Sequence, residues 1–180
     1  MKKTIIVFGS IAGALVSLFM ICLIKWVSKD HDKTAELLGY SSMILALSLV
    51  YVGVRNFRDR YNDGTISFGK ALRVALGITL IASTIYVLVW LVEYYCFMPD
   101  FMDKYAAEMI RQAKGSGLSP DALQKELAKI ESVRASYRNP IVVILYTYVE
   151  ILPVGIIISL LTALLVKRKH RPSPASAMVA

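Results

Sequence analysis

Four apolar runs in this 180-residue sequence are each about as long as a helix that crosses a lipid bilayer. The hydrocarbon core requires about 20 predominantly apolar residues in an α-helix. Because lipid offers the backbone no hydrogen-bonding partner, we expect these runs to be helices and not isolated strands. They cover residues 5–27, 37–54, 72–97 and 141–166. The sequence therefore predicts an all-α integral membrane protein, with residues 1–180 forming one membrane domain that has four transmembrane helices.

The composition agrees with a lipid environment. Hydrophobic residues make up 56% of the chain and charged residues 19%, whereas soluble domains average about 45–50% apolar and roughly 25% charged. A soluble chain of this length would have difficulty hiding so much apolar surface. The net charge of +8 would suggest nucleic acid as the partner of a soluble protein. Here we expect the lipid bilayer as the partner, and no nucleic acid.

Basic residues gather on one predicted face of the membrane. The N-terminus, the loop between the second and third runs, and a basic tail over residues 167–180 carry most of them, whereas the opposite face has nearly equal numbers of basic and acidic residues. The positive-inside rule then predicts a multi-pass protein of the bacterial inner membrane with both termini and a disordered tail in the cytoplasm. Candidate headgroup contacts on this face are Lys70, Arg73, Lys167, Arg168 and Lys169.

The connection over residues 98–140 is the only sizeable segment predicted outside the membrane. Apolar residues recur at helical spacing on either side of a Gly- and Pro-containing break, and Asp100 and Ser119 are typical N-cap residues. The pattern predicts an extracytoplasmic amphipathic helical hairpin between the third and fourth spans. Its apolar stripes are expected to pack against each other or to lie on the membrane surface.

Small residues recur every four positions in the first span, at Gly9, Gly13 and Ser17. This spacing lets two helix backbones approach closely in membranes. The pattern favours packing within the bundle, and a dimer interface is the alternative.

Two acidic residues lie within the predicted spans. Glu93 is about one turn from the end of the third span, where it can reach headgroups or water. Glu150 lies roughly 13 Å into the fourth span, close to the middle of a core about 30 Å thick. A carboxylate at that depth is unfavourable, so we expect Glu150 to face the bundle interior, to be paired, or to be protonated.

The neighbours of Glu150 define a candidate intramembrane polar site. Tyr146 and Thr147 lie one turn earlier on the same predicted face. Pro153 cannot donate to the carbonyl four residues before it and so permits a kink, whereas Gly155 allows close approach of another helix. Two interpretations stay open: a structural hydrogen-bonded network, or a site for proton carriage, cation binding or ligand contact.

No catalytic constellation is visible in the sequence. The two cysteines lack the spacing of a metal site, and the two histidines lie in charged flanking segments. Neither a phosphate-binding glycine loop nor a paired-acid motif is present. We therefore expect no enzyme activity, no metal and no cofactor.

The stretch "GYSSMILALSLVYVGVRNFRDRYNDGTISFGKAL", together with "PDFMDKYAAEM" and "YVEILPVGIIISLLTALLVKRK", resembles a bacterial family. This is the family catalogued as domain of unknown function 4199, whose members occur mainly in Bacteroidota. The resemblance implies a four-span inner-membrane protein with a long third loop. It implies no activity, and therefore no catalytic residue.

The sequence favours a non-enzymatic envelope protein that assembles with itself or with other membrane proteins. The alternative is a small proton- or ion-coupled transporter that uses Glu150 and Glu93. Transporters usually contain internal repeats or paired broken helices, whereas only the fourth span is clearly interrupted here.

Overall fold

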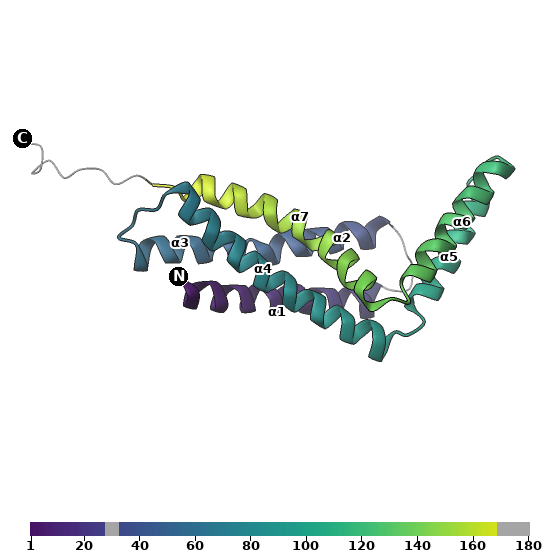
Figure 1. The fold of residues 1–180 in the computed structure, drawn as a ribbon, viewed down its shortest axis with the longest axis horizontal. Helices are drawn as coiled ribbons and strands as arrows, with labels where there is room; N and C mark the ends of the chain where they lie inside the picture. The colour runs from purple at the N-terminus through teal and green to yellow at the C-terminus, as the bar shows by residue number, and fades with distance from the viewer. Residues whose placement is uncertain (28–32, 169–180) are drawn as a thin grey trace, which may run out of the picture.

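A computed structural model describes residues 1–27 and 33–168, which fold almost entirely into helices (Figure 1). No strand is present in these two ranges, apart from one isolated bridge. The predicted all-α fold is confirmed. The elements are α1 (Lys2–Val27), α2 (Lys33–Leu47), α3 (Leu49–Tyr61), α4 (Phe68–Val92), the π-helix η1 (Glu93–Phe97), α5 (Phe101–Gly115), α6 (Pro120–Ser136) and α7 (Pro140–Val166).

Four helical segments are long and apolar enough to span a membrane: Lys2–Ile24, Leu37–Tyr61, Phe68–Phe97 and Pro140–Val166. Three of them match the predicted runs within a few residues. The second continues to Tyr61, past the predicted end at residue 54. The apolar run ends at residue 54, but the helix itself extends about two further turns into the polar sequence. The arginines that follow residue 54 lie on the last turns of α3.

A single residue, Ser48, separates α2 from α3. Its hydroxyl donates to the carbonyl of Leu45 at 2.6 Å, and its own carbonyl accepts from the amide of Tyr51 at 3.0 Å. A serine hydroxyl that bonds back to its own helix competes with the regular backbone ladder and bends the helix. The second span is therefore one interrupted helix rather than two spans.

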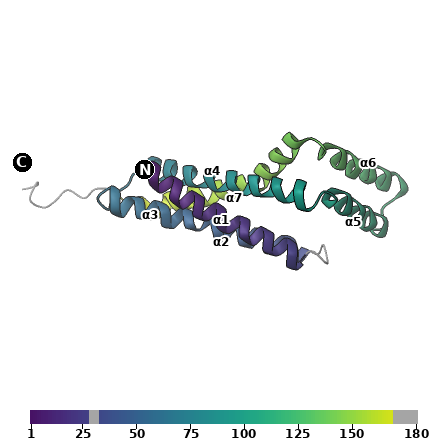
Figure 2. The same cartoon turned by 90° about the horizontal axis from the view of Figure 1, so that it is seen from below.

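The helix α4 lies at the centre of the bundle, with its most extensive contacts to α1 and α7 (Figures 1 and 2). Gly9 and Gly13 of α1 face it. A Cβ on Gly9 would come within 2.7 Å of the Ile81 Cβ, and one on Gly13 within 2.8 Å of the Ile85 Cβ. The stripe of small residues thus lets α1 approach α4 within the chain. Ser17, the third member of the stripe, is also buried.

The helices α5 and α6 form a hairpin that projects beyond the bundle (Figures 1 and 2). Their apolar stripes pack against each other around Ala106, Ala113 and Ile130, which is the first of the two predicted arrangements. An ion pair between Arg134 and Asp103, 2.8 Å long, joins the two helices.

Aromatic side chains connect the hairpin to the bundle. The ring of Trp90 meets that of Phe101 edge-on at 5.2 Å, and Tyr94 lies 6.2 Å from Tyr137. These rings surround buried Met102 at the base of α5. We refer to this end of the bundle as the hairpin end.

The other end, which we call the terminal end, carries Met1, the loop over residues 62–67 and Arg168 (Figure 1). The turn is left-handed at Asp63 (φ 49°) and Gly64 (φ 69°). Ile66 and Arg168 then exchange two backbone hydrogen bonds of 3.0 Å. The backbone from 167 to 168, predicted to begin the disordered tail, is therefore held by this bridge. The rest of that predicted tail, from residue 169 on, lies outside the described residues.

Candidate intramembrane site on α7

The start and the packing face of α7 follow from its sequence. The Asn139 side chain accepts from the amide of Ile141 at 3.0 Å, and Pro140 occupies the first helical turn. Eight residues at helical spacing form the buried stripe that faces the bundle: Val143, Thr147, Ile151, Gly155, Ser159, Thr162, Ala163 and Val166. The remaining surface of α7 is apolar and exposed, and Glu150 lies at the border between the two.

Glu150 is about 15 Å from the start of α7 at 1.5 Å per residue. Glu150 precedes buried Ile151. Protein atoms surround part of its carboxyl group, yet the residue as a whole is exposed in the isolated chain. Tyr146 and Val149 on the same surface are 49% and 69% exposed. The carboxylate is therefore not enclosed by the bundle, so the first of its three expected arrangements, in which it faces the interior, is not the one in the structure.

The polar group of the bundle that interacts with the Glu150 carboxylate is the hydroxyl of Tyr86. Tyr86 belongs to α4 and is 5% exposed. Tyr40 of α2 lies close enough to Tyr86 to interact electrostatically with it. Side chains of α2, α4 and α7 therefore gather at the site. Tyr86 was missed in the sequence, where a lone tyrosine within an apolar run was the only signal.

The predicted partners Tyr146 and Thr147 have other contacts. The Thr147 hydroxyl donates to the carbonyl of Val143 in its own helix at 2.8 Å. The ring of Tyr146 stacks on Tyr137 at 5.4 Å. Neither side chain has a hydrogen bond to Glu150 within the part of the chain that the structure describes, so the structure pairs Glu150 with Tyr86 and not with Tyr146 or Thr147.

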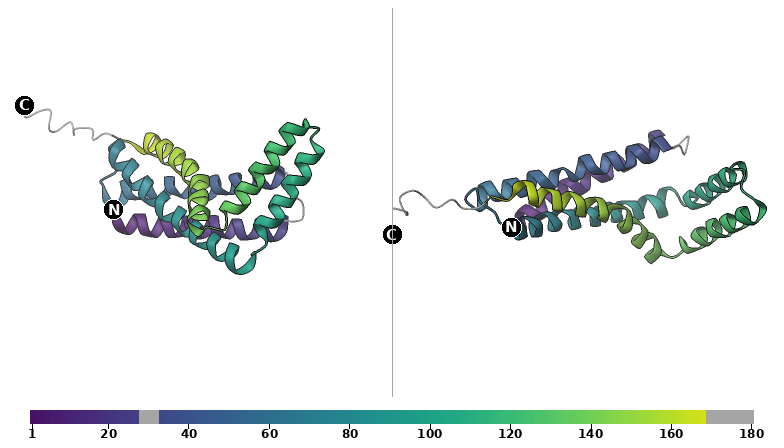
Figure 3. Two further views of the ribbon diagram at one scale, coloured as in Figure 1. Left: turned by 45° about the vertical axis from the view of Figure 1, so that its right-hand side comes forward. Right: turned by 90° about the horizontal axis from the view of Figure 1, so that it is seen from above.

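Pro153 lies inside α7, one turn after Glu150, and is exposed. Because proline has no N–H, the carbonyl of Val149 loses its partner within the helix. The helix changes direction near its middle, as Figure 3 shows. A carboxylate and a freed carbonyl thus lie at adjacent positions at membrane depth.

Gly155 marks the point where α7 crosses α4. A Cβ at this position would overlap the Cγ2 methyl of Thr79. The Thr79 hydroxyl lies 2.9 Å from the Ser159 hydroxyl and 3.5 Å from the carbonyl of Gly155. Thr79 and Ser159 are both fully buried, so the crossing is a close, polar contact.

Hydroxyl groups follow one face of α4 from this crossing toward Glu150. Thr79, Ser83 and Tyr86 are three or four residues apart, which places them on consecutive turns, and all three are buried. The Ser83 hydroxyl has no hydrogen-bonding partner among the described residues. We call these three residues the hydroxyl row.

Glu93 does not join this site. It begins the π-helix, and its carbonyl accepts from the amide of Met98 at 2.9 Å. The electrostatic interactions of Glu150 include Tyr86 but not Glu93. The two membrane acids are thus separate features.

The predicted headgroup contacts differ in their surroundings. The Lys70 ammonium donates to the side-chain carbonyl of Asn62 and lies 5.6 Å from the centre of the Phe57 ring, so it is tied to the protein. Arg73, Lys167 and Arg168 are exposed. Lys169 lies outside the described residues.

Within the described residues, no group of three His, Cys, Asp or Glu side chains is placed to hold a metal ion. Both histidines lie outside those residues. Cys22 and Cys96 are free thiols and exposed.

Residues 7–168 match the family model described as "Protein of unknown function (DUF4199)", which is the family suggested by the sequence. No curated protein and no solved structure matches the chain.

Proposed function

The chain belongs to the DUF4199 family of proteins of unknown function, and we propose that this multi-pass membrane protein is a non-enzymatic assembly protein of the cell envelope. In this proposal, the exposed surface of α7 around Glu150 is covered by a membrane-spanning helix of a second copy or of another protein. The exposure of Glu150 at membrane depth is the observation that carries the proposal.

An ionisable group within a membrane span almost always faces a bundle interior, a partner or water. The Tyr86 hydroxyl interacts with Glu150, but a carboxylate has two oxygens and several acceptor positions for further donors. The freed carbonyl of Val149 is a further acceptor. Hydroxyl, amide or histidine donors on a second helix would satisfy these groups, and such contacts hold membrane helices together.

The packing of α1 supports the choice of α7 as the interaction surface. Gly9 and Gly13 are occupied by α4 within the chain, so this stripe is not free to join another subunit. By contrast, the surface of α7 that carries Glu150 also presents Val149, Ile157 and Leu161, which are 69%, 57% and 54% exposed.

The proposal is tested by extracting the full chain in mild detergent and measuring the mass of the complex by light scattering. Chains that co-purify are identified by mass spectrometry. We expect a particle containing more than one chain of 20.0 kDa. Glu150→Leu should dissociate it, and Glu150→Gln, which keeps hydrogen-bonding capacity, should weaken it less. Glu93→Gln is the matched control and should leave the complex intact. A wild-type protein that is a single chain in detergent and in nanodiscs would refute the proposal.

A small proton- or ion-coupled carrier is the second candidate, and the hydroxyl row that leads toward Glu150 favours it. For such a carrier, Glu150 must ionise for transport, whereas its packing against a second membrane protein is not required. Glu150→Gln would then abolish pH-dependent flux in liposomes while the mass of the protein stays unchanged. The absence of any flux in wild-type liposomes would reject this candidate without affecting the assembly proposal.

A further inference from the structure

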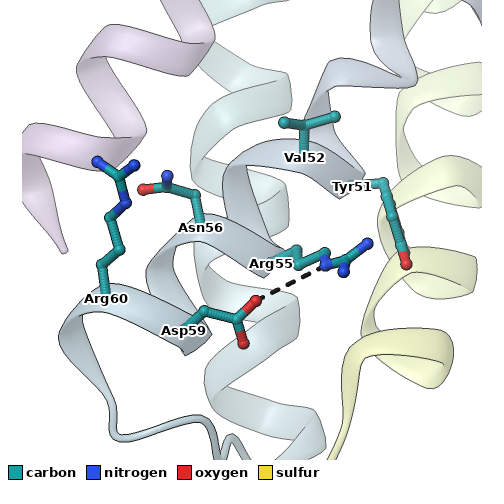
Figure 4. Close-up of a pocket in the computed structure, with 6 residues that line it drawn as sticks. All are labelled: Tyr51, Val52, Arg55, Asn56, Asp59 and Arg60. Atoms are coloured by element: carbon teal, nitrogen blue, oxygen red, sulfur yellow. Dashed lines mark ion pairs between the residues drawn. The ribbon is translucent and has the colours of Figure 1, made fainter.

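A shallow hollow lies on the outer surface of α3 at the terminal end. Its volume is about 340 Å³, at the lower end of the roughly 300–1,000 Å³ common for ligand sites. Two neighbouring rows of side chains line it, and within each row successive residues are one helical turn apart. One row consists of Tyr51, Arg55 and Asp59, and the other of Val52, Asn56 and Arg60. Figure 4 shows the Asn56 side chain between the two arginines, with Arg55 directed toward Tyr51 and Arg60 toward the opposite side.

The charges at the hollow are not balanced within the described chain. Arg58 binds both oxygens of Asp59, at 2.7 and 3.2 Å. Arg55 reaches the same carboxylate only at 3.6 Å and has a side chain that is 59% exposed. Arg60 has no ion pair with any described residue. Arg58 and Arg55 therefore share the one carboxylate of Asp59, and Arg55 and Arg60 keep donors for another anion.

The position of the hollow indicates what kind of anion it binds. It lies in the last turns of the membrane span Leu37–Tyr61. Tyr51 and Val52, on the side toward the membrane centre, are 36% and 47% exposed and form an apolar rim, and the arginines follow one and two turns later. An arginine guanidinium binds phosphate oxygens with paired N–H donors.

We infer that this hollow binds the phosphate of an anionic phospholipid. The guanidinium groups of Arg55 and Arg60 and the amide of Asn56 contact the headgroup, and the glycerol and upper acyl chain pack on Tyr51 and Val52. The guanidinium of Arg58 does not join the site, because it is held by Asp59 and by the carbonyl of Val166 at 3.2 Å.

The test measures lipid retention by native mass spectrometry of the full chain in detergent. Dioleoyl phosphatidylglycerol is compared with dioleoyl phosphatidylethanolamine, and inorganic phosphate is added as a competitor. We expect selective retention of phosphatidylglycerol. It should fall about tenfold in Arg55→Gln/Arg60→Gln, because each arginine near an anionic surface contributes to binding. Lys2→Gln/Lys3→Gln is the matched control, since it removes two exposed charges at the same end of the bundle, and it should reduce retention less than threefold.

Three results would overturn the inference. Equal losses in the two double variants would show diffuse charge attraction in place of a site. Equal retention of the two lipids would show that the hollow does not select an anion. Displacement of the lipid by millimolar inorganic phosphate would show a site for the free anion. If the double variant does not fold, Arg60→Gln alone decides, because that side chain has no ion pair to lose in the described chain.

Discussion

Thr79 and Gly155 are in such close contact that the glycine has no room for a side chain. The threonine hydroxyl is held by Ser159, so the methyl group cannot rotate away without losing that hydrogen bond. This contact fixes the distance between α4 and α7.

We expect Gly155→Ala to lower the free energy of unfolding by about 1–3 kcal/mol, the usual cost of overpacking a core. The measurement is an unfolding titration in mixed micelles. Thr79→Ser in the Gly155→Ala background should restore most of the loss, because it removes the methyl and keeps the hydroxyl. Gly39→Ala has open space around the new Cβ and should not destabilise the protein. A loss at Gly155 that Thr79→Ser does not reduce would argue against this contact as the cause.

Arg58 joins the end of α3 to the end of α7. Its side chain is 16% exposed and donates to the carbonyl of Val166, one of the last carbonyls of that helix. Hydrogen bonds from charged groups contribute roughly 1.5–3 kcal/mol, so Arg58→Gln should lower stability by about that amount. The same titration checks this, with exposed Arg73→Gln as the control. Equal effects of the two substitutions would show that total charge matters and the contact with Val166 does not.

We expect the ionisation of Tyr137, which lies at the end of α6 and outside the membrane spans, to lower stability at alkaline pH. Burial, with a smaller contribution from the negative charge of Glu150, raises the pKa of Tyr137 from 10.0 to about 12. Between these two values the unfolded chain loses this proton while the folded chain keeps it, so unfolding becomes more favourable as the pH rises. The contribution is fully present below pH 10 and is lost by about pH 12.

The comparison of Tyr137→Phe with the wild type isolates this group. The decline in stability between pH 10 and 12 should be shallower in the variant. The absorbance of ionised tyrosine in the wild type minus that in the variant should titrate near pH 12. A difference spectrum that titrates at pH 10 would contradict the prediction.

Cys96, exposed at the hairpin end, tests the orientation expected from the positive-inside rule. In a Cys22→Ser background it is the only cysteine. We expect a membrane-impermeant maleimide to label it in intact spheroplasts, because the hairpin end is predicted to face away from the cytoplasm. R73C in a cysteine-free background should be labelled only after permeabilisation. The reverse pattern would invert the predicted orientation.

The spans and the hairpin were predictable because they depend on local patterns. Apolar length identifies a membrane helix, and the Ser119 cap, which accepts from the amide of Ala122, follows from local turn chemistry. Asp100 shows the limit of such rules, since it occupies the N-cap position without a side-chain cap hydrogen bond.

The partners within the site were not predictable in the same way. Spacing along α7 suggested Tyr146 and Thr147 as neighbours of Glu150, but the partner is Tyr86, 64 positions earlier. Which residue of α4 meets Glu150 depends on how the two helices cross, and that is determined by the contact at Gly155. The bridge between Ile66 and Arg168 joins residues that are even farther apart in sequence. Hydropathy describes each helix alone and contains no information about these pairs.

The bridge between Ile66 and Arg168 has a consequence for biosynthesis. The loop at Ile66 leaves the ribosome about a hundred residues before its partner, so α1, α2, α3 and α4 are complete while α7 is still absent. During that interval Thr79 faces no Ser159 and Arg58 has no carbonyl of Val166 to bind. Until α7 is made, the first three spans therefore form an incomplete bundle whose contact surface for α7 is uncovered. Insertion of α7 covers that surface and forms the bridge to the loop at Ile66 in the same step.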